Sequence, residues 1–80
     1  MLIYNQRRTK IVNLNAIQSI MVDYNYDDGT YDMCCNAQGE LITLGKYKFA
    51  DMAAIALNEI LKAYDENKRI FFMPQDQEES

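Results

Sequence analysis

The sequence predicts an α+β fold: an antiparallel β-sheet of about five strands, arranged as a meander, with one C-terminal amphipathic helix packed on one face and a short final strand. Two observations predict it. Apolar and polar residues alternate in short stretches up to about residue 44, as in half-buried strands, and from about Phe49 the apolar period lengthens to that of a helix. Because the 80 residues suffice for one core, we expect a single domain at 1–74 and a disordered acidic tail at 75–80.

The first half of the chain is predicted to consist of strands. Residues 2–4 and 10–13 form an opening hairpin around a polar loop. Turn residues then divide the chain at 27–30 and at Gln38–Gly39, which favour chain reversal. The strands of the meander are therefore expected at residues 17–26, 31–37 and 40–44, and Gly45 is expected to end the last of them.

The helix is predicted over residues 49–67. Its apolar residues fall within one stripe that is wide enough to lie across a sheet: Phe49, Met52, Ala53, Ala56, Leu57, Ile60 and Tyr64. Asn67 can adopt the left-handed conformation that ends many helices. Residues 69–73 then read as the short final strand, which Pro74 ends.

Two residue types restrict the function. The chain has no histidine, which excludes His-based acid–base catalysis, Ser/His or Cys/His nucleophile pairs and His-ligated zinc. Its two cysteines, Cys34 and Cys35, are adjacent, and neighbours on a strand point to opposite faces. We therefore expect two reduced thiols, at least one of them in the core. The expectation is a protein that is not an enzyme and holds no cofactor.

The hydropathy pattern bears on location. The apolar runs are much shorter than the about 20 residues that a membrane-spanning helix needs. No apolar segment follows the basic residues near the N-terminus, as it would in a signal peptide. The expected location is therefore cytoplasmic, with no membrane contact.

Charge is unevenly distributed in this chain, whose net charge is −4. From Asp23 to Glu40 there are five acidic residues and no basic one. Four of the acidic residues define what we call the acidic turn: Asp23, Asp27, Asp28 and Asp32. Such a surface repels nucleic acid, and it can also imitate a phosphate backbone and occupy the basic groove of another protein.

The acidic turn also resembles the beginning of a calcium-binding loop. Asp23, Asn25 and Asp27 have the spacing of the first three ligand positions. The sixth position, which requires Gly, is Asp28, and the twelfth, which requires Glu, is Cys34. No metal site is therefore predicted here.

Three cations near the N-terminus form a second candidate site. Arg7, Arg8 and Lys10 make up the basic loop, a candidate contact for nucleic acid or phosphate. No phosphate-cradling glycine motif, ribonucleoprotein aromatic motif or helix-turn-helix accompanies them. Nucleic acid is accordingly not expected as the partner.

The predicted helix supplies a candidate partner-binding surface. Ile55 breaks the pattern, because it lies on the polar face between charged residues that include Glu59 and Lys62. Tyr47 stands between Lys46 and Lys48, and we expect its ring to be exposed. Tyrosine is favoured in interfaces. The surface formed by Ile55, Tyr47, Glu59 and Lys62 is therefore one candidate, and an exposed sheet edge is another.

Several short motifs resemble those of a group of small uncharacterised proteins from Gram-positive bacteria, their prophages and conjugative elements. They run over most of residues 1–74: Tyr4-Asn5, Thr9-Lys10-Ile11-Val12-Asn13-Leu14, Leu44-Gly45-Lys46-Tyr47, Ala53 to Leu57, Glu59-Ile60 and Ala63-Tyr64. The resemblance implies a compact sheet-plus-helix domain. It implies no assigned activity and transfers no catalytic residues.

The sequence as a whole favours a small non-enzymatic cytoplasmic module that binds a protein through a sheet edge or the outer helix face. A homodimer is compatible with a core of this size. The alternative is an acidic inhibitor of phage type, which imitates nucleic acid and blocks a nucleic-acid-binding or defence enzyme of the host.

Overall fold

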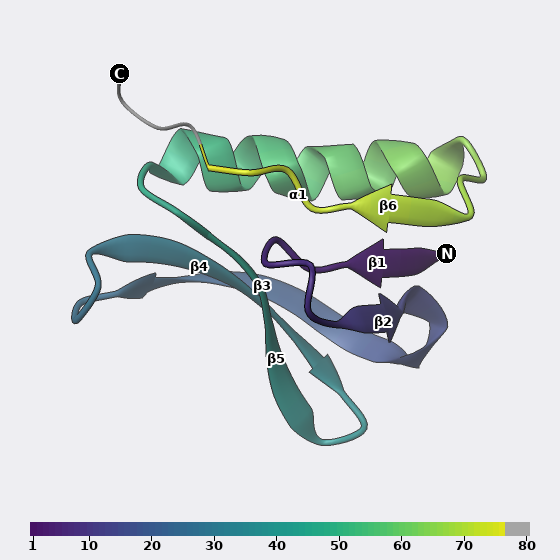
Figure 1. Cartoon of the computed structure of the whole chain (residues 1–80), viewed down its shortest axis with the longest axis horizontal. Helices are drawn as coiled ribbons and strands as arrows, with labels where there is room; N and C mark the ends of the chain where they lie inside the picture. Colours follow the sequence, from purple (N-terminus) through teal and green to yellow (C-terminus); the bar gives the residue numbers. More distant parts are fainter. Residues whose placement is uncertain (77–80) are drawn as a thin grey trace.

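The computed structural model describes residues 1–76 of the chain, which form two three-stranded sheets and one long helix (Figure 1). In chain order the elements are β1 (Leu2–Tyr4), β2 (Ile11–Asn13), the 3₁₀-helix η1 (Leu14–Ala16), β3 (Ile17–Asn25), β4 (Thr30–Ala37), β5 (Glu40–Tyr47), α1 (Ala50–Asp65) and β6 (Ile70–Phe72). The α+β class is confirmed, and so is the antiparallel meander of β3, β4 and β5.

The prediction of one sheet is wrong. The strand orders are β2-β1-β6, which we call the small sheet, and β3-β4-β5, the meander. The two are separate because η1, capped by the side chain of Asn13, turns the chain between β2 and β3. The helix also lies in mid-chain, since it connects the meander to β6. That crossover lets β6 pair parallel to β1, with Phe71 opposite Ile3.

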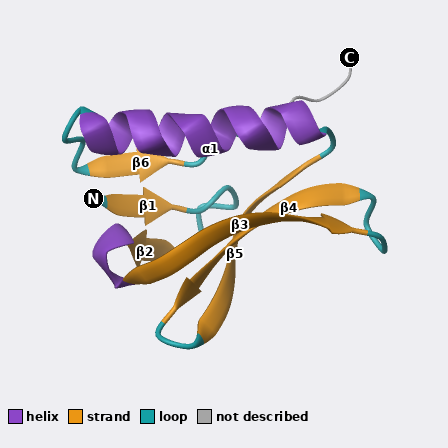
Figure 2. Cartoon of the chain, turned by 180° about the vertical axis from the view of Figure 1, so that it is seen from behind, coloured by secondary structure: helices purple, strands orange, loops and turns teal. Residues whose placement is uncertain are grey.

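The core lies between the small sheet, the meander and α1. Figure 2 shows, from behind, the helix extending along one side of the molecule while the meander crosses below it. The helix packs mainly on β4 and β5. The buried cluster draws on all three parts and contains Ile3, Val12, Met33, Cys35, Leu44, Tyr47, Ala53, Ala56, Ile60 and Met73.

The helical stripe is confirmed along the middle of α1, where Ala53, Ala56 and Ile60 are buried. At its ends the prediction is wrong, because Phe49 and Tyr64 are exposed. Phe49 precedes the first helical residue, and Tyr64 lies on the margin of the stripe. The predicted end is confirmed. Asn67 has a φ of +58°, and the amide of Lys68 donates to Ala63 O at 3.0 Å.

Gly45 does not end a strand, contrary to the prediction, because β5 continues to Tyr47. Opposite Met33 and Cys34 of β4, β5 has one extra residue, Leu44, which is buried. The ring of Tyr47 folds back over Gly45, where a Cβ would lie 3.0 Å from its hydroxyl oxygen. The absence of a side chain at Gly45 therefore leaves room for the ring of Tyr47 in this position.

The C-terminal segment was predicted to be disordered from residue 75. Gln75 and Asp76 make hydrogen bonds to Gln6 O and Lys48 N, at 2.8 and 3.1 Å. The rest of the predicted tail, residues 77–80, lies outside the described residues. In the described part of the chain, α1 is too short and too polar to cross a membrane.

Candidate functional site

The small sheet leaves one of its faces uncovered. Ile3 and Val12 point into the core, so their neighbours along the strands point outward. Register pairs place the outward residues side by side, with Leu2 next to Ile70 and with Tyr4 between Ile11 and Phe72. Four of these outward side chains are exposed: Leu2, Ile11, Ile70 and Phe72. The exposed fraction is 50% for Ile70 and 55% for Phe72. We call Leu2, Tyr4, Ile11, Ile70 and Phe72 the outer face.

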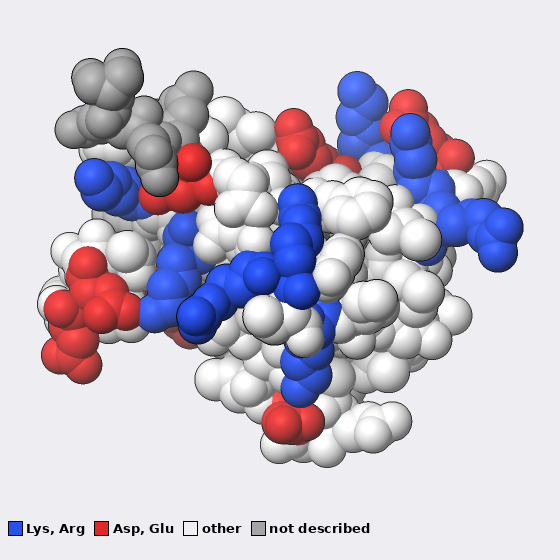
Figure 3. Space-filling model, in the orientation of Figure 1, with Lys and Arg blue, Asp and Glu red and all other residues white. Residues whose placement is uncertain are grey.

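Cations surround the outer face. Figure 3, in the orientation of Figure 1, shows Lys and Arg side chains gathered on either side of the small sheet, with a mostly white surface between them. Five of the chain's eight cations come from the segments that flank β1, β2 and β6: Arg7, Arg8, Lys10, Lys68 and Arg69. Among the described residues, one of the five forms an ion pair, Lys10 with the exposed Glu40 at 4.0 Å. A chain of net charge −4 thus carries a local basic rim around an apolar face.

Arg8 is held against the outer face. Its guanidinium carbon lies 5.5 Å from the ring centre of Tyr4 and 5.1 Å from that of Phe72, within the range of cation–π contacts. The two rings are themselves 5.7 Å apart. Arg8 Nη1 also donates to the carbonyls of Tyr4 and Asn5, at 3.3 and 3.1 Å. The charge of Arg8 is therefore fixed in position over two aromatic rings.

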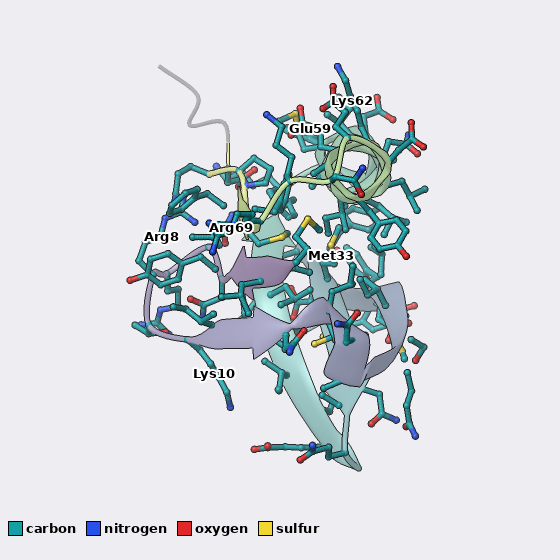
Figure 4. All side chains as sticks on the ribbon, turned by 90° about the vertical axis from the view of Figure 1, so that its right-hand side faces the viewer. Arg8, Lys10, Met33, Glu59, Lys62 and Arg69 are labelled. Carbon is teal, nitrogen blue, oxygen red and sulfur yellow. The ribbon has the colours of Figure 1, made fainter. Side chains whose placement is uncertain are left out.

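The basic loop is shaped by Asn5, a buried polar residue. Its Oδ1 accepts from the amides of Thr9 and Lys10, at 2.8 and 3.0 Å, and its Nδ2 donates to Thr9 Oγ1 at 3.0 Å. These bonds close the loop and hold Arg8 at a φ of +60°. The structure thus places Arg8 and Lys10 at the edge of the outer face, as Figure 4 shows.

Of the four predicted partner-binding residues, the three on the helix are exposed and Tyr47 is buried. Ile55 is 50% exposed, as expected, and Glu59 and Lys62 lie on the same helix, away from Arg8 and Lys10 (Figure 4). The expectation for Tyr47 is wrong, because its ring is fully buried and its hydroxyl donates to Pro74 O at 2.8 Å. Burial raises the pKa of Tyr47 to about 12, with Asp76 and Glu59 adding to the shift.

The acidic turn is partly neutralised. Lys46 Nζ pairs with Asp28 and lies 3.8 Å from Asp32, and the hydrogen bond to Asp28 raises the pKa of Lys46. Asn25 Nδ2 also donates to both carboxylates, at 3.3 and 3.0 Å. Asp23 and Asp27 form no ion pair among the described residues. Within residues 1–76 no group of three or more His, Cys, Asp or Glu side chains is arranged to hold a metal ion.

The cysteines are free and buried, as expected. Cys35 belongs to the core cluster, and Cys34 Sγ lies 3.8 Å from Thr43 Oγ1. Burial and the neighbouring Cys34 raise the pKa of Cys35. A buried thiol with a raised pKa is protonated at neutral pH and is a poor nucleophile.

The outer face is what the sequence interpretation missed. The strands that carry it were predicted, and their alternation already separates Leu2 and Tyr4 from Ile3. The missing information was which face the rest of the chain covers. Comparison with protein families, curated proteins and solved structures finds no match to this chain.

Proposed function

We propose that this protein is a small non-enzymatic module that binds an acidic protein surface through the outer face. The observation that supports the proposal is the contiguous group of exposed apolar side chains on that face, Leu2, Ile11, Ile70 and Phe72. Single exposed apolar residues are common, but a contiguous patch with a polar rim is typical of an interaction surface. This sheet face is neither of the surfaces favoured from the sequence.

The basic rim indicates that the partner is negatively charged where it binds. Arg8 and Lys10 flank one end of the outer face, and Arg69 flanks the other beside Leu2 and Ile70. Cations around an apolar centre complement a partner whose apolar residues are surrounded by Asp and Glu, because opposite charges steer association and fix orientation. We expect salt to lower the affinity of such a complex, because it screens the charge interactions. The apolar contacts should persist at high salt.

A protein partner fits this face better than a nucleic acid does. Single-stranded nucleic acids bind open aromatic rings on which bases can stack. The guanidinium of Arg8 lies over the rings of Tyr4 and Phe72, so a base that stacked on this side of either ring would have to displace it. The remaining centre, Leu2, Ile11 and Ile70, is aliphatic, and aliphatic side chains gain most from burial against other apolar side chains.

Two isoleucines provide a matched test, since Ile70 on the outer face and Ile55 on the outer helix face are both 50% exposed. The full chain and its Ile70→Glu and Ile55→Glu variants would be immobilised and incubated with lysate of a Gram-positive bacterium, to which the sequence resemblance points, with and without nuclease treatment. Bound proteins would be identified by mass spectrometry at low and high salt. Circular dichroism checks that each variant folds.

We expect at least one protein that the wild type and Ile55→Glu retain and that Ile70→Glu loses. Retention by Ile70→Glu with loss by Ile55→Glu would assign binding to the helix face and contradict the proposal. Binding that disappears after nuclease treatment would also contradict it, because the ligand would then be a nucleic acid.

A further inference from the structure

Strand β3 has an open edge. It is nine residues long, and among the described residues it pairs with β4 alone. In the described part of the chain, no backbone–backbone hydrogen bond reaches its other side. Edge strands are commonly protected by shortness, by Lys or Pro, or by bulges. In β3 the single charged residue is Asp23, there is no Lys or Pro, and the register shift lies at its start, between Ile17 and Ser19.

An apolar groove lies beside this edge. The helix packs mainly on β4 and β5, and its C-terminal half also lies near the N-terminal half of β3. The groove between them has a volume of about 550 Å³ and is lined by Leu14, Asn15, Ile17, Ile20, Leu57, Ile60, Leu61 and Tyr64. Leu61 and Tyr64 are 63% and 61% exposed. The apolar stripe of the helix therefore extends past the core, through the exposed Leu61 and Tyr64.

We propose that a second copy of this chain occupies the edge and the groove, as a two-fold symmetric dimer in which β3 pairs antiparallel with β3 of the partner. Such pairing joins the two meanders into one continuous six-stranded sheet. The two-fold axis is then perpendicular to the sheet, so both helices lie on the same side of it. Their stripes of Leu57, Leu61 and Tyr64 face each other above the paired strands and fill both grooves.

The charges of β3 favour a second copy as the occupant. A pairing centred on Met21, the middle residue of β3, places Asp23 opposite the neutral Ser19, so no like charges meet. The antiparallel direction also places the acidic turn of each copy beside η1 of the other, and η1 has no charged residue. The two acidic turns are thereby kept at opposite ends of the dimer.

The length of β3 also favours a second copy of the chain as the occupant. A strand of nine residues spans about 30 Å at 3.4 Å per residue, close to the 33 Å of the molecule's longest axis. Pairing along its whole length gives an extended interface. A two-fold axis brings the same patch of each copy together, and the groove is lined mainly by apolar side chains, which can pack against their own kind. Two outer faces would instead bring their cations together. The dimer therefore leaves the outer face free, and it does not depend on the proposed function.

The test is the solution mass of the full chain, measured by analytical ultracentrifugation from about 1 μM to about 1 mM. We expect a monomer–dimer equilibrium in this range. Leu61→Lys, at an exposed groove position, should raise the dimer dissociation constant at least about tenfold, because the change buries a charge in the interface. Ile55→Lys, on the same helix outside the groove, should leave the constant unchanged.

Hydrogen exchange supplies a second measurement that needs no substitution. The outward amides of β3 should exchange more slowly at high protein concentration than at low concentration, since they become bonded to the partner strand. A monomer over the whole range overturns the proposal. A dimer that resists Leu61→Lys, or whose concentration-dependent protection lies in β6 instead of β3, overturns it as well.

Discussion

The side chain of Gln6 pairs with the backbone of Lys46 as a neighbouring strand would. Its Oε1 accepts from Lys46 N at 2.8 Å, and its Nε2 donates to Lys46 O at 3.0 Å. Next to this pair, Gln6 N donates to Leu44 O at 2.7 Å. The amide thus closes the free edge of β5 and joins the loop between β1 and β2 to the meander. Of the two edges of the meander, β5 is covered here and β3 is open.

Replacing Gln6 should destabilise the fold, because its side chain joins the loop between β1 and β2 to β5 of the meander. Gln6→Ala removes both side-chain bonds to Lys46, and we expect the free energy of unfolding to fall by about 1–2 kcal/mol. Urea denaturation measures the change. Gln18→Ala is the control, because Gln18 is exposed on β3 and makes no side-chain hydrogen bond among the described residues, so its effect should stay within about 0.5 kcal/mol. Equal losses in the two variants would contradict this role of Gln6.

Adding a single methyl group at Gly45 should be costly. The Cβ of Gly45→Ala would lie 3.0, 3.1 and 3.2 Å from the hydroxyl oxygen and two ring carbons of Tyr47, tighter than most non-bonded contacts, so the ring would have to shift. We expect a loss of about 1–3 kcal/mol in the free energy of unfolding, as for other overpacked cores. In a Tyr47→Leu background the same change should cost clearly less, because the ring that it meets is gone. A double-mutant cycle by thermal or urea unfolding measures this difference, and strictly additive losses would show that the contact is not the cause.

Tyr47 should make the stability of the fold sensitive to high pH. Its ordinary pKa is 10.0, and in the folded protein the value is about 12, so the folded state retains the phenol proton more strongly than the unfolded state does. This contribution is fully present below about pH 10 and is lost as pH rises to about 12, up to about 2–3 kcal/mol.

The comparison with Tyr47→Phe isolates that contribution. The variant keeps the ring and loses the hydroxyl that donates to Pro74 O, at a cost of about 1 kcal/mol at neutral pH. Between about pH 9 and about pH 11.5 its unfolding free energy should decline less than that of the wild type. Parallel declines in the two proteins would mean that Tyr47 titrates as freely as an exposed tyrosine.

The thiols should be unreactive until the protein unfolds. Cys34 and Cys35 are buried and free, and the pKa of Cys35 is raised by burial. With a thiol-specific chromogenic disulfide reagent at neutral pH, we expect slow labelling of the native protein and rapid labelling of two thiols in denaturant. Rapid native labelling of Cys35 would show that the core around β4 opens easily. Labelling of no thiol in denaturant would reveal a disulfide, in conflict with the structure.

Several features of the fold follow from short-range chemistry and could be predicted from the sequence. The change of period near Phe49 located the helix within about two residues of its bounds, and the left-handed conformation of Asn67 ended it. A turn also lies at Gln38 and Gly39, as predicted. These features depend on backbone preferences of neighbouring residues, which are present whatever the rest of the chain does.

Long-range contacts decided the remaining features. Nothing near Ile70 in the chain indicates that β6 pairs parallel to β1, since that pairing depends on where α1 returns the chain. Burial of Tyr47 depends on the missing side chain of Gly45 and on the distant carbonyl of Pro74. The exposure of the outer face likewise depends on which of two sheet faces the helix and meander cover. Periodicity shows that a strand has two different faces, but which of them meets another layer is settled when distant parts of the chain compete for the same apolar surface.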